Sequence, residues 1–249
     1  MTKVIGIVSY LPNDNKIRTN RWNKLVNLIS TCNKLFELKI FIEAQCWSPL
    51  EIHEINSRFS NVTIYYNQDK LGIVGARRKL REHFLQSSYD VLIMLDDDCE
   101  LKGTKEEAIK YLQQIDDNPN MFYEHNGTLL KLFAISKDIF KEVDFEDVNP
   151  ENGEGFEDRV FVNKLRNLFP EKKYTFVGCR VFDCSISTKD VNSTWYTNQD
   201  VKKMLENTSK FLEEHFAKLK WVRVFSHTCV ITSKWRAYKE WQKIRLERH

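Results

Sequence analysis

Three consecutive carboxylates, Asp96, Asp97 and Asp98, directly follow an uninterrupted apolar run at residues 91–95. Such a run is typical of a strand buried in a parallel sheet, and ligands of open α/β sheets bind beyond the carboxyl ends of the strands. Adjacent negative charges repel one another unless a cation offsets them. Because hard oxygen ligands suit Mg²⁺ or Mn²⁺, the sequence predicts a divalent cation here, sharing its ligand shell with phosphate oxygens.

The acidic cluster has two other interpretations. A calcium-binding EF-hand loop would place ligands at Asp96, Asp98, Glu100 and Glu107, but its sixth position is Leu101 where glycine is needed, and a strand precedes it where a helix should. A solvated turn at a strand end, where aspartate is common, stays open as the alternative.

Two further segments carry groups suited to a phosphorylated ligand and its chemistry. Residues 71–79 read LGIVGARRK, so that small residues and Arg77 open an expected helix, an arrangement that favours a diphosphate. Residues 153–161 read GEGFEDRVF, which places Glu157 and Asp158 at the start of another helix. The alternatives are a loop-to-helix junction with surface cations and simple helix capping.

Together these segments resemble glycosyltransferases of the GT-A fold, most closely the large family of inverting, non-processive enzymes with many bacterial and phage members. The resemblance covers about the first two-thirds of the chain. It matches Asp96-Asp97-Asp98 to the Asp-x-Asp motif of that family, and it implies that Asp98 coordinates the metal while Asp96 lies near the ribose or the metal. It also implies that Arg77 and Asp97 contact the donor.

The same resemblance suggests roles for residues elsewhere in the chain. Asp158 would be the general base that takes the proton from the acceptor hydroxyl, and Glu157 would bind the acceptor or orient the site. The nucleotide would lie against residues at the ends of the first two strands, Ser9, Tyr10 and Glu43. His227 would be an additional metal ligand, with a structural histidine in an apolar run as the alternative. Arg18 and Arg21 are candidate phosphate contacts, with a solvated helix start as the alternative.

Strands and helices alternate in the pattern that such a site needs. Apolar runs predict strands at 4–10, 38–43, 62–66 and 91–95, and helical periodicity appears at 21–36, 72–86 and 104–115, the last capped by Thr104 with Glu107 three residues on. The less regular second half predicts strands at 129–135, 174–182 and 221–231 and helices at 136–143, 156–168 and 199–219. The predicted fold class is α/β, a Rossmann-like, mostly parallel sheet flanked by helices, with a catalytic domain at 1–200 and a basic helical extension at 201–249 packed on the same domain.

Composition fits an ordinary globular enzyme, with 42% hydrophobic and 29% charged residues. No apolar run approaches the length of a membrane span and no signal peptide is evident, which predicts a cytoplasmic protein. The six cysteines are scattered along the chain, which predicts free thiols in a reducing compartment. The net charge of +3 divides unevenly, because residues 201–249 carry 12 Lys or Arg against 5 Glu. That segment interleaves cations with aromatic residues, which suits a phosphate backbone or stacked bases, although the same side chains would also pack on the body of the protein.

The sequence therefore predicts a metal-dependent hexosyltransferase that uses Mn²⁺ or Mg²⁺ and moves one sugar from a nucleotide-diphosphate sugar, by default a UDP-hexose, to an acceptor hydroxyl with inversion. The absence of the Gln-x-x-Arg-Trp motif of processive synthases favours transfer of a single sugar. The acceptor would be a modified DNA base or a glycan. The alternatives are a nucleotidyltransferase and a non-catalytic, basic nucleic-acid-binding module.

Overall fold

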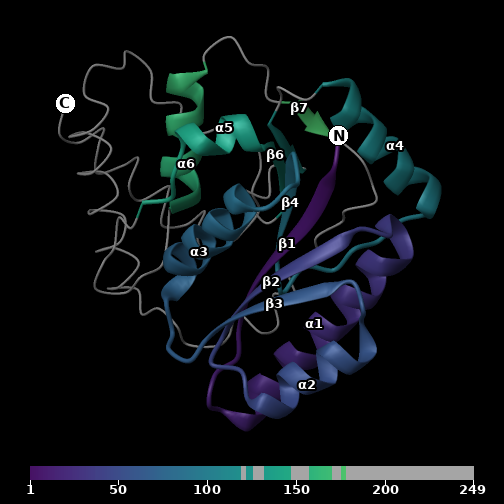
Figure 1. The fold of residues 1–249 in the computed structure, drawn as a ribbon, viewed down its shortest axis with the longest axis vertical. Coiled ribbons are helices and arrows are strands. Elements are labelled where there is room, and N and C mark those ends of the chain that lie inside the picture. Colours follow the sequence, from purple (N-terminus) through teal and green to yellow (C-terminus); the bar gives the residue numbers. More distant parts are fainter. Residues whose placement is uncertain (119–121, 126–131, 147–156, 170–174, 178–249) are drawn as a thin grey trace, which may run out of the picture.

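The computed structural model describes residues 1–118, 122–125, 132–146, 157–169 and 175–177. These residues form one seven-stranded sheet in the order β3-β2-β1-β4-β6-β5-β7, with helices on both faces (Figure 1). The elements are β1 Lys3–Tyr10, α1 Asn15–Phe36, β2 Lys39–Gln45, α2 Pro49–Arg58, β3 Val62–Asn67, α3 Gly72–Gln86, β4 Val91–Asp96, α4 Lys105–Asp117, β5 Tyr123–His125, β6 Leu132–Ser136, α5 Lys137–Glu142, α6 Glu157–Leu168 and β7 Thr175–Val177.

The central strands of the sheet are parallel, as the alternation of strands and helices predicts. β1 lies between β2 and β4 and is parallel to both, and β3 is parallel to β2. β6 runs antiparallel to β4, so that Leu132 at the start of β6 lies opposite Leu95 near the end of β4. The carboxyl ends of β1, β2 and β4 therefore share one edge of the sheet, and β6 begins at that edge.

The two faces of the sheet are covered by different helices, as Figure 1 shows. Ile5, Ile42 and Ile93 point toward α1, α2 and α4 and form one hydrophobic cluster with them. Val8, Phe41 and Met94 point the other way and form a second cluster with α3, α5 and α6. Because successive side chains of a strand alternate between faces, the side chain that ends each strand faces one of these two sets of helices.

Local capping signals fix where the helices begin. Thr104 and Glu107 form the expected capping box at α4. Asp14 accepts hydrogen bonds from two backbone amides, so α1 begins at Asn15, ahead of the predicted start at residue 21. The sequence analysis missed α2, which Ser48 and Glu51 begin with a second capping box.

Several predicted elements fall partly or wholly outside the described residues. The described parts of β6, α5, α6 and β7 agree with the strand or helix expected there. The helix predicted at 199–219, the strand predicted at 221–231 and the whole extension at 201–249 lie outside the described residues. In the part of the chain that the structure describes, no helix has both the length and the apolar character needed to cross a bilayer.

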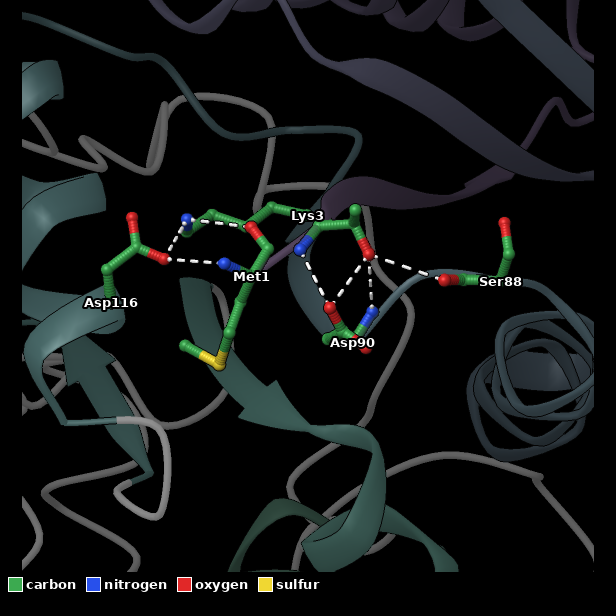
Figure 2. Close-up of polar contacts among 6 residues, drawn as sticks. Met1, Lys3, Ser88, Asp90 and Asp116 are labelled. Atoms are coloured by element: carbon green, nitrogen blue, oxygen red, sulfur yellow. Dashed lines mark hydrogen bonds and ion pairs between the residues drawn. The ribbon is translucent and has the colours of Figure 1, made fainter.

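The amino ends of β1 and β4 are joined at the edge of the sheet opposite the carboxyl ends (Figure 2). The amino terminus of Met1 and the Lys3 side chain both pair with Asp116 of α4, at 3.3 and 2.6 Å. The Thr2 amide donates to the Asp90 carboxylate at 2.8 Å, and the Thr2 hydroxyl donates to the Ser88 carbonyl. These contacts fix the start of β1 against the start of β4.

Gly6 in the middle of β1 allows α3 to pack closely on the sheet. A Cβ atom at this position would lie 2.7 Å from Leu92 Cδ1 and 2.9 Å from Leu80 Cδ2, closer than carbon atoms approach. Replacing Gly6 with Ala is therefore expected to lower the free energy of unfolding by about 1–3 kcal/mol, because the Leu92 and Leu80 side chains that meet the added methyl group must shift. Urea unfolding measures this, and an unchanged free energy of unfolding would contradict the close packing.

Candidate active site

The carboxyl edge of the sheet brings together three segments that are far apart in sequence. Asp96 ends β4, Arg77 lies in the second turn of α3, and Glu157 and Asp158 open α6. Asp96 continues the series Leu92 and Met94, so alternation turns it toward α3 and α6. The three motifs that the sequence analysis singled out therefore meet at one place.

Arg77 is the centre of this meeting point. Its guanidinium is buried, with Nη1 donating to Glu157 Oε1 at 2.9 Å and Nη2 lying 3.1 and 3.3 Å from the two oxygens of Asp96. The Phe145 ring centroid is 5.6 Å from the guanidinium carbon. Burial by itself would lower the pKa of Arg77, but the negative charges of Asp96, Glu157 and Asp158 together outweigh it and raise this pKa. Arg77 is therefore a fixed positive charge inside the site.

Asp97 points away from Arg77. Its carboxylate accepts a hydrogen bond from the backbone amide of Tyr10 at 3.3 Å and is nearly buried. Burial raises the pKa of Asp97 to about 6, against the lowering effect of the Arg21 guanidinium. Asp97 therefore ties the turn after β4 to the end of β1. The contact between Asp97 and a donor stays a prediction.

The oxygen donors at this edge suit a metal that shares its ligand shell with a diphosphate. Asp96 and Asp98 are both half-buried, so neither is sealed in the interior. Within the described residues no three His, Cys, Asp or Glu side chains are grouped to hold a metal. Mg²⁺ commonly uses only one or two carboxylates and completes its shell with phosphate oxygens and water, so this pair fits such an ion. His227, the additional ligand predicted from the resemblance, lies outside the described residues.

Tyr10, at the end of β1, has cations close to its ring. The Lys70 ammonium lies 5.0 Å from the ring centroid, and the guanidinium carbon of Arg21 lies 5.9 Å from it. Arg21 also donates to the Tyr10 carbonyl at 3.1 Å. An aromatic ring beside two cations suits a nucleotide, which offers a base for stacking and phosphates for the cations. Ser9 is almost completely buried beside this surface, and the nucleotide contact predicted for it stays a prediction.

Arg18 has a structural position. Its guanidinium pairs with Glu51 of α2, with Nε 2.8 Å from Oε1. It also donates to the carbonyls of Leu11, Pro12 and Cys46, which belong to the loops after β1 and β2. These contacts point Arg18 toward the loops that border the site and occupy its hydrogen-bond donors. The geometry therefore favours a structural role for Arg18 over a phosphate contact.

Glu43 lies in β2 under α3, two residues before the end of the strand. Its carboxylate is fully buried, accepts a hydrogen bond from the Asn67 amide and has Oε2 3.5 Å from His83 Nε2. Burial raises the pKa of Glu43 to about 7, although the Asn67 hydrogen bond lowers it in part. The nucleotide contact predicted for Glu43 stays a prediction. Gln45, which the sequence analysis passed over, ends the strand on the same face, and its side chain accepts from the Leu71 amide at 2.6 Å.

Replacing Glu43 with Gln is expected to stabilise the protein at high pH. The raised pKa means that folding favours the protonated carboxyl, so its contribution is complete below pH 4.5 and is lost as the pH rises through about 7. The variant should gain up to about 3 kcal/mol in free energy of unfolding at pH 8 and little at pH 4.5. Urea unfolding at both pH values measures this. Glu54→Gln, which changes an exposed carboxylate on α2, is the control, and an equal effect of Glu43→Gln at both pH values would contradict the prediction.

The described fold is similar to that of proteins of known structure. The structure is similar to S. aureus TarS 1-349, with a TM-score of 0.52 at 12% sequence identity over 90% of this chain and 76% of that chain. The complexes of TarS 1-349 with UDP-GlcNAc and with UDP both give a TM-score of 0.51, at 14% and 12% identity, covering 90% and 94% of this chain and 77% and 78% of that chain. No protein-family model and no curated protein matches the sequence. The α/β fold predicted from the sequence, with its mostly parallel central strands flanked by helices, is thereby confirmed.

Proposed function

We propose that this protein is a metal-dependent glycosyltransferase that transfers one sugar from a nucleotide-diphosphate sugar to an acceptor hydroxyl. The observation that carries the proposal is the contact of Arg77 with both Asp96 and Glu157, because this one guanidinium joins the three segments that resemble glycosyltransferase motifs. The similarity of the fold to TarS, whose structures include complexes with UDP and UDP-GlcNAc, supports a nucleotide-sugar donor. A UDP-hexose is the donor we expect.

The described residues suggest a division of roles. Asp98 and Asp96 would hold Mn²⁺ or Mg²⁺, which would offset the charge that develops on the diphosphate leaving group. The Tyr10 ring, with Arg21 and Lys70 beside it, would receive the nucleotide. Asp158 is half-buried in the first turn of α6, close enough to contribute to the raised pKa of Arg77, and would accept the proton of the acceptor hydroxyl.

Direct displacement by an acceptor that Asp158 deprotonates would invert the configuration at the anomeric carbon. We propose a modified DNA base or a glycan as the acceptor, since the 201–249 segment is basic and rich in aromatic residues. Binding of DNA that does not weaken with salt, or no binding at all, would favour the glycan.

The experiment that tests the proposed function is a panel of nucleotide sugars with Mn²⁺, with and without a chelator. Release of nucleoside diphosphate from one donor, lost with the chelator, is the expected result. Donor binding is measured in the same samples by thermal shift, because the lack of an acceptor can also prevent release of nucleoside diphosphate. No release and no metal-dependent shift with any donor would overturn the proposal and favour a non-catalytic, basic binding module.

A further inference from the structure

Arg77 places a positive charge against a carboxylate that the proposed function assigns to the metal. Its Nη2 nitrogen lies within 3.3 Å of both oxygens of Asp96, and its side chain is only 3% exposed. A cation in this position compensates the negative charge that would otherwise attract a divalent ion. The same guanidinium is held from the other side by Glu157, whose side chain is 10% exposed.

We propose that Arg77 is an internal counter-ion that competes with the metal for Asp96, and that Glu157 sets how strongly it competes. The inference rests on the proposed function for the identity of the metal site. Glu157 neutralises part of the Arg77 charge, so that Asp96 keeps part of its affinity for a metal. When Asp96 turns to a metal, Arg77 keeps its partner Glu157, so that no buried charge is left unpaired. Glu157 is thus a positioning residue.

Contacts around Arg77 keep its guanidinium in place when Asp96 turns to a metal. Phe145 covers the guanidinium, and Arg78 of the same helix donates to the backbone carbonyl of Phe145. These contacts hold α3 against the segment that follows α5. The Arg77 charge therefore stays beside the 96–98 turn when Asp96 turns to a metal.

The proposal makes opposite predictions for two variants that each remove one charge. Arg77→Gln should tighten binding of Mn²⁺ to the donor-free protein about tenfold, because the competing charge is gone. Glu157→Gln should weaken it by a similar factor, since the whole charge of Arg77 then acts on Asp96. A role of both residues in general stability alone would move both variants in the same direction.

The experiment is titration of Mn²⁺ into the full-length protein, followed by electron paramagnetic resonance of the free ion, with and without UDP. Arg81→Gln is the matched control, because it removes the same charge from the same helix at a guanidinium that contacts the Phe140 ring and carbonyls of α5. Arg77→Lys keeps the charge and should bind Mn²⁺ nearly as the wild type does. Thermal unfolding confirms that each variant is folded, and Glu157→Gln with Arg77→Lys decides the question if Arg77→Gln does not fold.

Each result has a defined meaning. Tighter binding by Arg77→Gln with weaker binding by Glu157→Gln supports the inference. If both variants shift in the same direction, or if both bind Mn²⁺ as Arg81→Gln does, the inference is overturned while the proposed function stands. If no form of the protein binds Mn²⁺ with or without UDP, the metal dependence in the proposed function fails, and the inference fails with it.

Discussion

Replacing Asp98 with Ala is expected to weaken Mn²⁺-dependent binding of UDP about 100-fold or more. The side chain follows β4 at the carboxyl edge, is half-buried and is one of only two carboxylates that we assign to the metal. A metal that draws most of its ligands from phosphate and water depends heavily on each protein oxygen, and even residues behind the ligands change metal affinity 10–100-fold. Isothermal titration of UDP in Mn²⁺ and in chelator measures the effect.

The control for this variant is Glu100→Ala. Glu100 lies two residues further along the same acidic turn, is exposed and pairs with Lys102 at 3.6 Å. If the turn acts only as a diffuse negative patch, both variants should weaken UDP binding equally. Equal and small effects would favour the solvated turn that the sequence left open, and the metal assignment of Asp98 would be withdrawn.

Replacing Asp158 with Asn is expected to lower turnover about 1000-fold and leave donor binding unchanged. A positioned general base contributes a factor of about 10²–10⁴, and Asn keeps the shape of the side chain while losing the ability to accept a proton. Turnover is measured as nucleoside diphosphate released from the donor that the panel identifies, and binding is measured by titration calorimetry. Retained turnover would remove the base assignment.

Helix capping is the competing explanation for Asp158, and the chain offers a matched comparison. Asp138 also lies in the first turn of a helix, α5, and it pairs with Lys141 on the protein surface at 3.2 Å. If Asp158 serves only the helix dipole, then Asp158→Asn should behave as Asp138→Asn does and lose about 0.5 kcal/mol of stability without loss of turnover. A large difference in turnover between the two variants would distinguish catalysis from capping.

The sequence was most informative where the structure depends on residues that are neighbours in the chain. The run at 91–95 predicts β4, and the Thr104-Glu107 pair predicts the start of α4, because both depend on neighbouring residues alone. The analysis missed α2, whose apolar pattern is weak: Ile55 is its buried residue, and Leu50 is 79% exposed. The capping box at Ser48 was the signal that could have revealed it.

The candidate site was predictable only in part. The positions of Asp96, Arg77 and Glu157 relative to their strands and helices predict that they gather at one edge of the sheet. Nothing in the sequence pairs Arg77 with Glu157, 80 residues away, because the choice of partner depends on how α3 and α6 pack. For the same reason the sequence did not show that Glu43 lies beneath α3, which approaches the sheet where Gly6 leaves room for it.

The hydrogen bonds and ion pairs at the amino edge of the sheet also indicate where the molecule can be attached to a sensor chip. Thr2 donates to the backbone carbonyl of Ser88, and the Ser88 side chain is not among the atoms joined there (Figure 2). Because Ser88 is exposed and precedes β4, a biotin linker at this position would anchor the protein by the edge opposite Asp96. Immobilised molecules would then share one orientation, with the carboxyl ends of β1, β2 and β4 facing the flowing analyte.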